Sequence, residues 1–207
     1  MLKDKNMNYY SYIVARDFGF APNPFGKHCT LATCKPRIRK TAKINDWIFG
    51  LSGKALNYKL IFAMKVSKKI TFNEYWESPE FQYKKPIING SLKQMYGDNI
   101  YFFDKKTNKW HQENSHHSLD NGEINYLNLN RDTKGEFVLI ADEFYYFGRE
   151  MIDIPKEIKD SFLIGIGFKK VGEEQANQLI EYLRNNYHIG IYGDPISFED
   201  FLRYDGK

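Results

Sequence analysis

Two adjacent histidines in a polar stretch are the most chemically suggestive residues of this 207-residue chain. His116 and His117 are followed by Ser118, and a third histidine, His111, lies a few residues upstream. Because imidazole titrates near neutrality, such a histidine can act as a general base or can donate a hydrogen bond to a phosphate. The competing interpretation is an exposed polar loop that contains two histidines. We predict that His116 and His117 are catalytic and that Ser118 contributes to nucleotide binding.

A loop rich in prolines and glycines near the N-terminus carries a second set of polar side chains. Asp17 and Asn23 lie in this loop. Such side chains can hydrogen-bond the edge of a nucleobase, although they are also ordinary turn formers. We predict that Asp17 is catalytic, that Asn23 binds nucleotide, and that Asp17 lines a common pocket with His116 and His117.

Further candidates for chemistry are a cysteine and several carboxylates. Cys34 lies next to a cluster of basic residues, which favour a thiolate and make it a candidate nucleophile. A buried, inert cysteine is the alternative. Asp132, Asp142 and Glu143 are candidates for acid/base work or metal binding, and a solvated strand end explains them equally well.

The spacing of cysteines and histidines does not predict a metal site. Cys29 and Cys34 lack the Cys-x-x-Cys spacing of zinc sites, and neither a His-x-x-x-His nor a His-Glu-x-x-His pattern occurs. Their odd separation places the two side chains on opposite faces of a shared strand, so we expect them to be reduced and unbridged. The sequence assigns no cofactor and no oligomeric state.

The net charge of +4 conceals a strong asymmetry. Residues 1–69 carry 14 Lys and Arg against 3 Asp and Glu, a net of +11, whereas the remaining residues carry 16 against 23, a net of −7. A basic region of this kind suggests an anionic partner, and a solvated face is the alternative. We therefore predict a nucleotide or nucleic acid as partner, with contacts from Lys35, Arg37 and Arg39. These three belong to a dense basic segment completed by Lys40 and Lys43.

Aromatic residues are abundant, with 16 Phe, 15 Tyr and 3 Trp. Most are expected in the core, but one or two at a loop mouth would suffice to stack a base, at ~1–3 kcal/mol per base. We predict that Trp47 binds nucleotide in this way. The other candidates for a stacking pocket are Phe18, Phe25, Tyr145 and Tyr146.

The elements that must position these residues are mostly short strands. β-branched and aromatic runs bounded by turn residues predict most of them. The predicted strands are Tyr9–Ala15, His28–Thr33, Trp47–Leu51, Lys59–Ser67, Ile100–Phe103, Lys109–Gln112, Tyr126–Asn130, Phe137–Ala141, Asp142–Phe147 and Phe162–Phe168.

Helices are fewer. Thr71 with Glu74 forms a capping-box pattern at the start of a short helix, and Gly172–Asn186 has a 3.6-residue apolar period. A last short helix is predicted at Phe198–Tyr204. This order favours an α+β fold with a mixed, partly barrel-like sheet and one amphipathic helix near the C-terminus, and it argues against a doubly wound fold.

The length favours a single domain over residues 1–207, with a basic lobe at 1–69 and a strand–helix segment at 156–207. Apolar runs are too short to span a membrane, and the N-terminal residues lack the apolar core of a signal peptide. We therefore expect a cytoplasmic protein without a membrane partner.

Three segments, SYIVARDFGFAPNPF, CTLATCKPRIRK and NDWIFG, resemble the nucleotide-modification-associated domains of the second type. The resemblance continues through GDNIYFF, the SHHS tetrad and VLIADEFYYFG. It implies a role around DNA base hypermodification in bacterial and phage modification or defence systems. The NDWIFG turn, with the strand and short helix after it, is also similar to the PUA, ASCH and EVE domains, small barrels that bind modified bases or RNA.

Two functions of different classes therefore remain open. One is an enzyme that acts on a base or nucleotide through the histidine pair and Asp17. The other is a non-catalytic reader of modified bases, with an aromatic pocket and a basic rim. Convergence of the histidines on the Asp17 loop favours the enzyme, whereas an aromatic cleft without titratable groups favours the reader.

Overall fold

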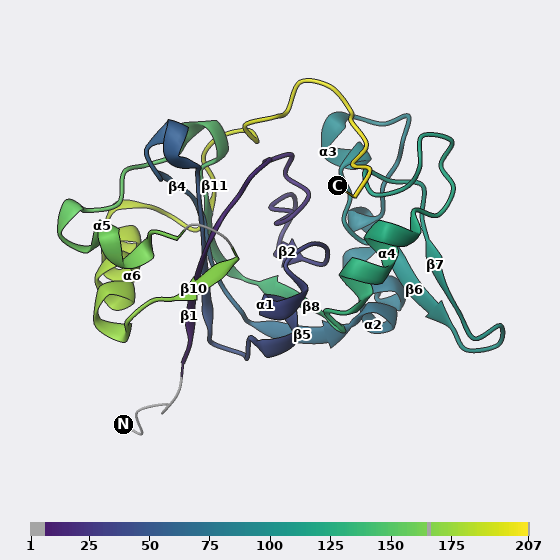
Figure 1. Ribbon diagram of the computed structural model, residues 1–207, viewed down its shortest axis with the longest axis horizontal. Helices are drawn as coiled ribbons and strands as arrows, with labels where there is room; N and C mark the ends of the chain where they lie inside the picture. The colour runs from purple at the N-terminus through teal and green to yellow at the C-terminus, as the bar shows by residue number, and fades with distance from the viewer. Residues whose placement is uncertain (1–6, 165–166, 207) are drawn as a thin grey trace. The chain divides into compact units, whose positions relative to one another are not determined.

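The computed structural model describes residues 7–164 and 167–206 and divides the chain into two compact units (Figure 1). The first unit contains the segment that ends at Asp17, together with Ala42–Ser67 and Ala141–Ile196. The second contains Phe18–Thr41, Lys68–Ile140 and the segment that begins at Ser197. Both units are therefore assembled from segments far apart in the sequence.

The first unit is built on a mixed six-stranded sheet with the order β10-β1-β3-β4-β9-β11. β1 pairs with β3 in parallel and with β10 antiparallel, β4 pairs antiparallel with both β3 and β9, and β9 pairs in parallel with β11. The strands are β1 (Tyr9–Ile13), β3 (Trp47–Leu51), β4 (Leu60–Lys65), β9 (Glu143–Tyr146), β10 (Phe168–Lys170) and β11 (Gly190–Ile191).

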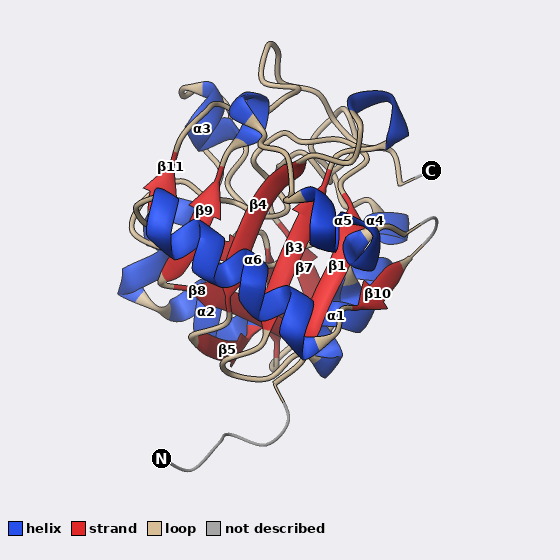
Figure 2. Ribbon diagram, turned by 90° about the vertical axis from the view of Figure 1, so that its left-hand side faces the viewer, coloured by secondary structure: helices blue, strands red, loops and turns tan. Residues whose placement is uncertain are grey.

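Helices α5 (Lys156–Phe162) and α6 (Glu173–Asn186) complete this unit, and α6 crosses one face of the sheet (Figure 2). The apolar positions of α6 follow the helical period, so one stripe can be buried while the other faces water. Ala176, Leu179, Ile180 and Leu183 accordingly pack in one core with the sheet residues Trp47 and Phe49. Short η1 (Lys54–Leu56) and η3 (Gly148–Glu150) turns connect strands.

The second unit combines two smaller sheets with short helices. β2 (Cys29–Leu31), β8 (Phe137–Ala141) and β5 (Lys68–Thr71) form one sheet, and β6 (Tyr101–Asp104) and β7 (Lys109–Gln112) form a separate antiparallel hairpin. The helical elements are α1 (Pro36–Thr41), α2 (Phe72–Glu77), η2 (Pro79–Lys84), α3 (Leu92–Met95) and α4 (Tyr126–Thr133).

The α+β class and most predicted strands are confirmed. The capping box is confirmed too, since the Thr71 hydroxyl accepts from the Glu74 N–H and the Glu74 carboxylate accepts from the Thr71 N–H. Within the described residues the strands form three sheets and no closed barrel, in contrast with the partly barrel-like sheet that we expected.

The prediction of a strand at Tyr126–Asn130 is wrong, because these residues begin helix α4. The apolar residues Tyr126, Leu127 and Leu129 suggested a strand, but the first two are exposed. The Asn125 side chain caps the helix by accepting from the N–H groups of Leu127 and Asn128. The buried face of the helix carries the polar Asn128 and Asp132 beside Leu129, and only the tertiary structure supplies partners for these polar side chains.

Two other predictions near the C-terminus also fail. Of the strand predicted at Phe162–Phe168, Phe162 ends α5 and Phe168 begins β10, while residues 165–166 lie outside the described residues. The segment Phe198–Tyr204 forms no helix. It has no regular secondary structure and belongs to the second unit, where the Tyr204 N–H donates to the carbonyl of His116.

Candidate active site

A cysteine, a histidine and an aspartate form a continuous polar chain within the second unit. The Cys34 Sγ lies 3.9 Å from His117 Nε2, and His117 Nδ1 lies 2.7 Å from Asp132 Oδ2. His117 and Asp132 are buried, whereas Cys34 is half-buried. A nucleophile, a base and a third group that orients the base are the parts of a nucleophilic catalytic triad.

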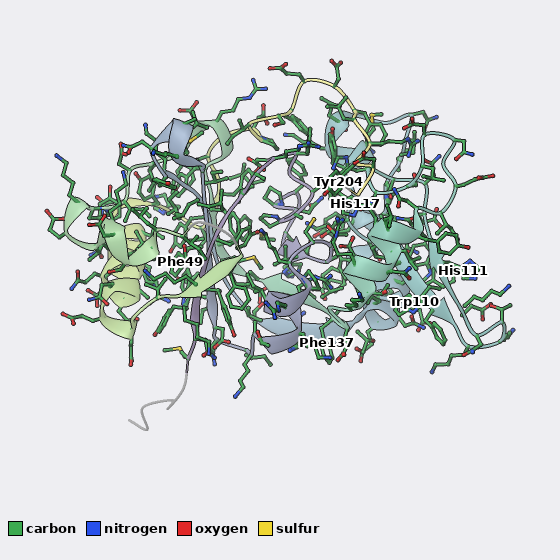
Figure 3. The ribbon with its side chains drawn as sticks, in the orientation of Figure 1. Phe49, Trp110, His111, His117, Phe137 and Tyr204 are labelled. Carbon is green, nitrogen blue, oxygen red and sulfur yellow. The ribbon has the colours of Figure 1, made fainter. Side chains whose placement is uncertain are left out.

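Three different elements bring these residues together. Cys34 lies between β2 and α1, His117 lies in the loop between β7 and α4, and Asp132 lies in the last turn of α4. Figure 3 shows His117 close to Tyr204 of the C-terminal segment, and their ring centroids are 5.5 Å apart.

Helix α4 and the hairpin hold the His117 loop. The Asn128 and Gln112 side-chain amides both donate to the carbonyl of His117, each at 2.9 Å. Asn128 and Asp132 are four residues apart, so they lie on the same face of α4. One helix face therefore fixes both the backbone and the ring of His117.

Asp132 is the centre of the cluster. Its carboxylate accepts from the Tyr101 hydroxyl at 3.0 Å and from the N–H of Cys34 at 2.9 Å, in addition to His117. Burial works against its charged form, but His117, Arg39 and Arg131 outweigh this and lower the pKa of Asp132 to about 2. The group is thus a carboxylate at neutral pH.

His117 is the partner that gains most from this carboxylate. Burial alone disfavours the imidazolium, but the charge and hydrogen bond of Asp132 raise the pKa of His117 to about 9. At neutral pH the ring therefore carries both protons, with Nδ1–H directed to Asp132 and Nε2–H facing the Cys34 sulfur.

The backbone at Cys34 is strained. Cys34 and Lys35 have φ values of 54° and 38°, in the left-handed region that non-glycine residues rarely adopt. Each such residue costs of the order of 1–3 kcal/mol and persists only where its surroundings enforce it. Here Asp132 accepts from the Cys34 N–H, and Arg39 Nε donates to the Cys34 carbonyl at 2.8 Å. The same two side chains thus hold the sulfur in place.

The three predicted site residues His116, His117 and Ser118 have different surroundings in the structure. His117 belongs to the chain described above, whereas His116 Nδ1 lies against the carbonyl of Leu202, and its ring is enclosed by Phe18 and Phe20. The Ser118 hydroxyl donates to the carbonyl of Ser115 and so closes a tight turn.

The polar residues of the predicted N-terminal loop fall in different units. In the first unit, Asp17 accepts from the Tyr146 hydroxyl at 2.6 Å and from the Ile196 N–H at 3.2 Å. In the second unit, Asn23 donates to the Tyr96 carbonyl and accepts from the buried Lys84. The common pocket of Asp17 with the histidine pair stays a prediction.

The basic segment does not present all its charges to solvent. Arg39 is fully buried, Lys35 is half-buried with its pKa lowered by burial, and Arg37 is exposed. Trp47 is buried in the first unit and stacks on Phe49. For Arg39 and Trp47, burial leaves little surface for a ligand.

Cys34 and Asp132 were each considered from the sequence, but neither was placed with His117. They are 83 and 15 residues from it in the chain. No local sequence pattern predicts a contact between residues so far apart. The one feature that pointed to Cys34 was the cluster of basic residues beside it. Among the described residues, no group of three or more His, Cys, Asp or Glu side chains is arranged to hold a metal ion.

The charged state of His117 makes the stability of the protein depend on pH. The raised pKa of His117 stabilises the folded protein fully below its ordinary value of 6.5, and this contribution is lost as pH rises through about 9. The free energy of unfolding should therefore fall by about 1–2 kcal/mol between pH 6.5 and 8. Urea unfolding at several pH values measures this fall.

The titrations of Asp132 and Lys84 have little effect on stability between pH 6.5 and 8. Asp132 contributes stability that is lost only as pH falls through about 2, and Lys84, whose pKa burial lowers to about 8, acts in the opposite direction at higher pH. A free energy of unfolding that rises from pH 6.5 to 8 would contradict the charged state assigned to His117.

Comparison with known proteins gives one match. The family model described as nucleotide modification associated domain 2 matches residues 6–201, which is nearly the whole chain and includes Cys34, His117 and Asp132. No curated protein and no solved structure matches the chain. None of the helices in the described residues is long and apolar enough to cross a membrane.

Proposed function

We propose, since the chain belongs to the nucleotide modification associated domain 2 family, that the protein is an enzyme that modifies nucleotides or nucleic acid. Cys34 is its nucleophile. The observation that carries the proposal is the position of the buried His117 between the Asp132 carboxylate and the Cys34 sulfur.

The chemistry follows from the charges. Because His117 is protonated at neutral pH, its Nε2–H lies against the Cys34 sulfur and stabilises negative charge there when the thiol releases its proton to solvent. The sulfur forms a bond to an electrophilic carbon of the substrate, and the displaced electron pair moves to a neighbouring heteroatom. That heteroatom takes the proton from His117 and leaves with the electron pair of its broken bond to carbon. Water then attacks the same carbon, gives a proton to His117 and displaces the sulfur, which restores Cys34 and the protonated ring.

Asp132 keeps the ring of His117 in one orientation throughout. Its hydrogen bond to Nδ1 directs Nε2 toward the sulfur and stabilises the imidazolium. We extend the proposal to base hypermodification of DNA in a bacterial or phage modification or defence system, which rests on the family and on the resemblance described above.

The test is the reactivity of Cys34 toward iodoacetamide. At pH 6 a free thiol, with a pKa near 8.5, is almost wholly protonated. We expect Cys34 to react at least about tenfold faster than glutathione, because the protonated ring of His117 lies 3.9 Å from its sulfur and an adjacent cation of this kind activates a cysteine nucleophile. Peptide mapping should find no label on Cys29, which is fully buried and whose pKa burial raises to about 12.

Matched variants separate the two thiols. Cys34→Ser should abolish labelling, whereas Cys29→Ser should label like the wild type. Nucleotides and oligonucleotides should slow the labelling of Cys34 if its sulfur lies where they bind. A thiol that reacts like glutathione and is unaffected by any of these ligands would overturn the proposal. Tight binding of modified bases with such an ordinary thiol would favour a non-catalytic reader.

A further inference from the structure

The β6–β7 hairpin of the second unit has two different faces. Along β6 the side chains alternate, so Tyr101 and Phe103 lie on one face and Phe102 lies on the other. The Tyr101 hydroxyl reaches Asp132, and Gln112, its partner on β7, donates to the His117 carbonyl. One face of the hairpin therefore braces the candidate active site.

The opposite face carries a row of stacked rings. Phe102 and His111 are paired across the hairpin and stack with centroids 4.6 Å apart and an interplanar angle of 5°. Trp76 of α2 stacks on Phe102, also at 4.6 Å, and the Lys85 ammonium lies 3.5 Å from the centroid of the Trp76 ring.

This row is accessible and is held rigidly. The three rings are only partly buried, and the His111 side chain at the end of the row is 45% exposed. The Asn73 side chain of α2 both donates to the Phe103 carbonyl and accepts from its N–H, each at 2.8 Å, which fixes α2 against β6. A planar ring with an open face on a fixed support is a platform for stacking a base.

The hairpin tip supplies positive charge. Lys105, Lys106 and Lys109 are exposed there, and His111 and Trp110 follow them on β7 (Figure 3). The one acidic residue of the hairpin is Asp104. Its carboxylate closes the turn by accepting from the Lys106 N–H and the Thr107 hydroxyl, each at 2.8 Å, and its Oδ2 lies 4.0 Å from His111 Nε2.

We propose that this face of the hairpin, together with Trp76, binds single-stranded nucleic acid. A base stacks on His111 at the end of the row, and the phosphates of neighbouring nucleotides contact Lys105 and Lys106. At ~3.3 Å per residue along a strand, Lys105 lies about 10 Å beyond the paired Phe102 and His111. An oligonucleotide is long enough to place one base on His111 and the phosphates of its neighbours at the lysines of the tip.

The inference names the substrate class of the proposed enzyme, and in that respect it rests on the proposed function. A strand bound here would lie on a hairpin whose other face holds the active site. Duplex fits less well, because its bases are already stacked on one another and cannot stack on a protein ring without being unpaired.

The test measures the fluorescence anisotropy of a labelled oligothymidylate, an oligouridylate and a DNA duplex, titrated with the whole protein at several salt concentrations. Both single strands should bind more tightly than the duplex. His111→Ala should weaken single-strand binding about 5- to 100-fold, as expected for a lost stacking partner. His111→Phe keeps an aromatic face and should retain most of the affinity.

Charge is tested separately. Lys105→Gln with Lys106→Gln should flatten the dependence of log affinity on log salt by about 1.4, since each phosphate contact on a single strand contributes about 0.7. The matched control is Lys54→Gln with Lys156→Gln, two exposed lysines of the first unit. It should leave the slope unchanged.

Several outcomes overturn the inference. They are a duplex that binds as tightly as the single strands, His111→Ala with wild-type affinity in a folded protein, and equal losses in the two lysine double variants. Labelling of Cys34 in the same variants keeps the two proposals apart. Binding of single strands by a protein with an unreactive Cys34 would support the hairpin surface and contradict the proposed enzyme. A reactive Cys34 without single-strand binding would support the enzyme and contradict the hairpin surface.

Discussion

Replacing Arg39 with alanine should destabilise the protein by about 3–5 kcal/mol, the range typical for loss of a buried charged partner. Arg39 is fully buried, and its guanidinium donates to the carbonyls of Cys34, Phe137 and Asp132. Alanine removes a donor from each of these oxygens, opens a cavity and removes a cation that stabilises the Asp132 carboxylate.

The chain at Gly135 packs closely against Arg39. A Cβ placed on Gly135 would lie 2.4 Å from the Arg39 guanidinium, so the neighbouring chain is packed directly against the charged group. A glycine at this position permits that close approach, and it ties the loop after α4 to the segment that carries Cys34.

Arg37→Ala is the matched control. It makes the same chemical change two residues away, where the side chain is exposed, and should cost no more than about 0.5 kcal/mol. Urea unfolding of the three proteins measures the differences. An Arg39→Ala protein as stable as Arg37→Ala would contradict the buried role of Arg39 and would restore it as a candidate for ligand binding.

Asp132→Asn should slow the alkylation of Cys34 at neutral pH by about 100-fold, the lower end of the contribution usual for a positioned acid or base. The substitution keeps the size of the side chain but replaces an anion with a neutral amide. His117 then loses the carboxylate that raises its pKa, so the imidazolium beside the sulfur is no longer favoured.

The control for this change is Asp120→Asn, an exposed aspartate close to His117 in the chain. It should alkylate at the wild-type rate. Circular dichroism of both variants establishes that they are folded, and the fall in stability between pH 6.5 and 8 should vanish in Asp132→Asn alone. A folded Asp132→Asn protein with wild-type reactivity would show that His117 does not activate Cys34.

The candidate site was only partly predictable. The histidine pair was recognisable because two adjacent imidazoles in a polar stretch are a local feature. The sequence could not show which of the two histidines belongs to the site. That depends on which ring faces Asp132 and Cys34 and which one packs between Phe18 and Phe20. A one-residue shift along the loop would exchange their roles without any change in composition.

The basic segment shows the same limit. Its charge pattern correctly indicated a cluster of cations, and Arg37 is exposed as a ligand-binding residue would be. Arg39 carries the same charge two residues further on and is buried, because the carbonyls that satisfy its guanidinium come from residues as distant as Phe137. Burial of a charge depends on partners that are remote in the chain.

Elements with a local sequence pattern were predictable before the structure was known. Helix α6 follows from its apolar period, the start of α2 from the Thr71–Glu74 capping box, and the β6–β7 hairpin from two strands around a polar turn. In each case the pattern that predicts the element lies within a short window of sequence, although α6 is stabilised by packing against the distant sheet.

The remaining part of the site depends on tertiary contacts between segments far apart in the chain. It includes the formation of a helix by Tyr126–Thr133, with the polar Asn128 and Asp132 on its buried face beside Leu129. It also includes the contacts of Asp132 in that helix with both His117 and Cys34. These polar groups are tolerated in the interior only because distant segments supply their hydrogen bonds and opposite charges. The site therefore exists only in the folded chain, where segments almost a hundred residues apart satisfy one another.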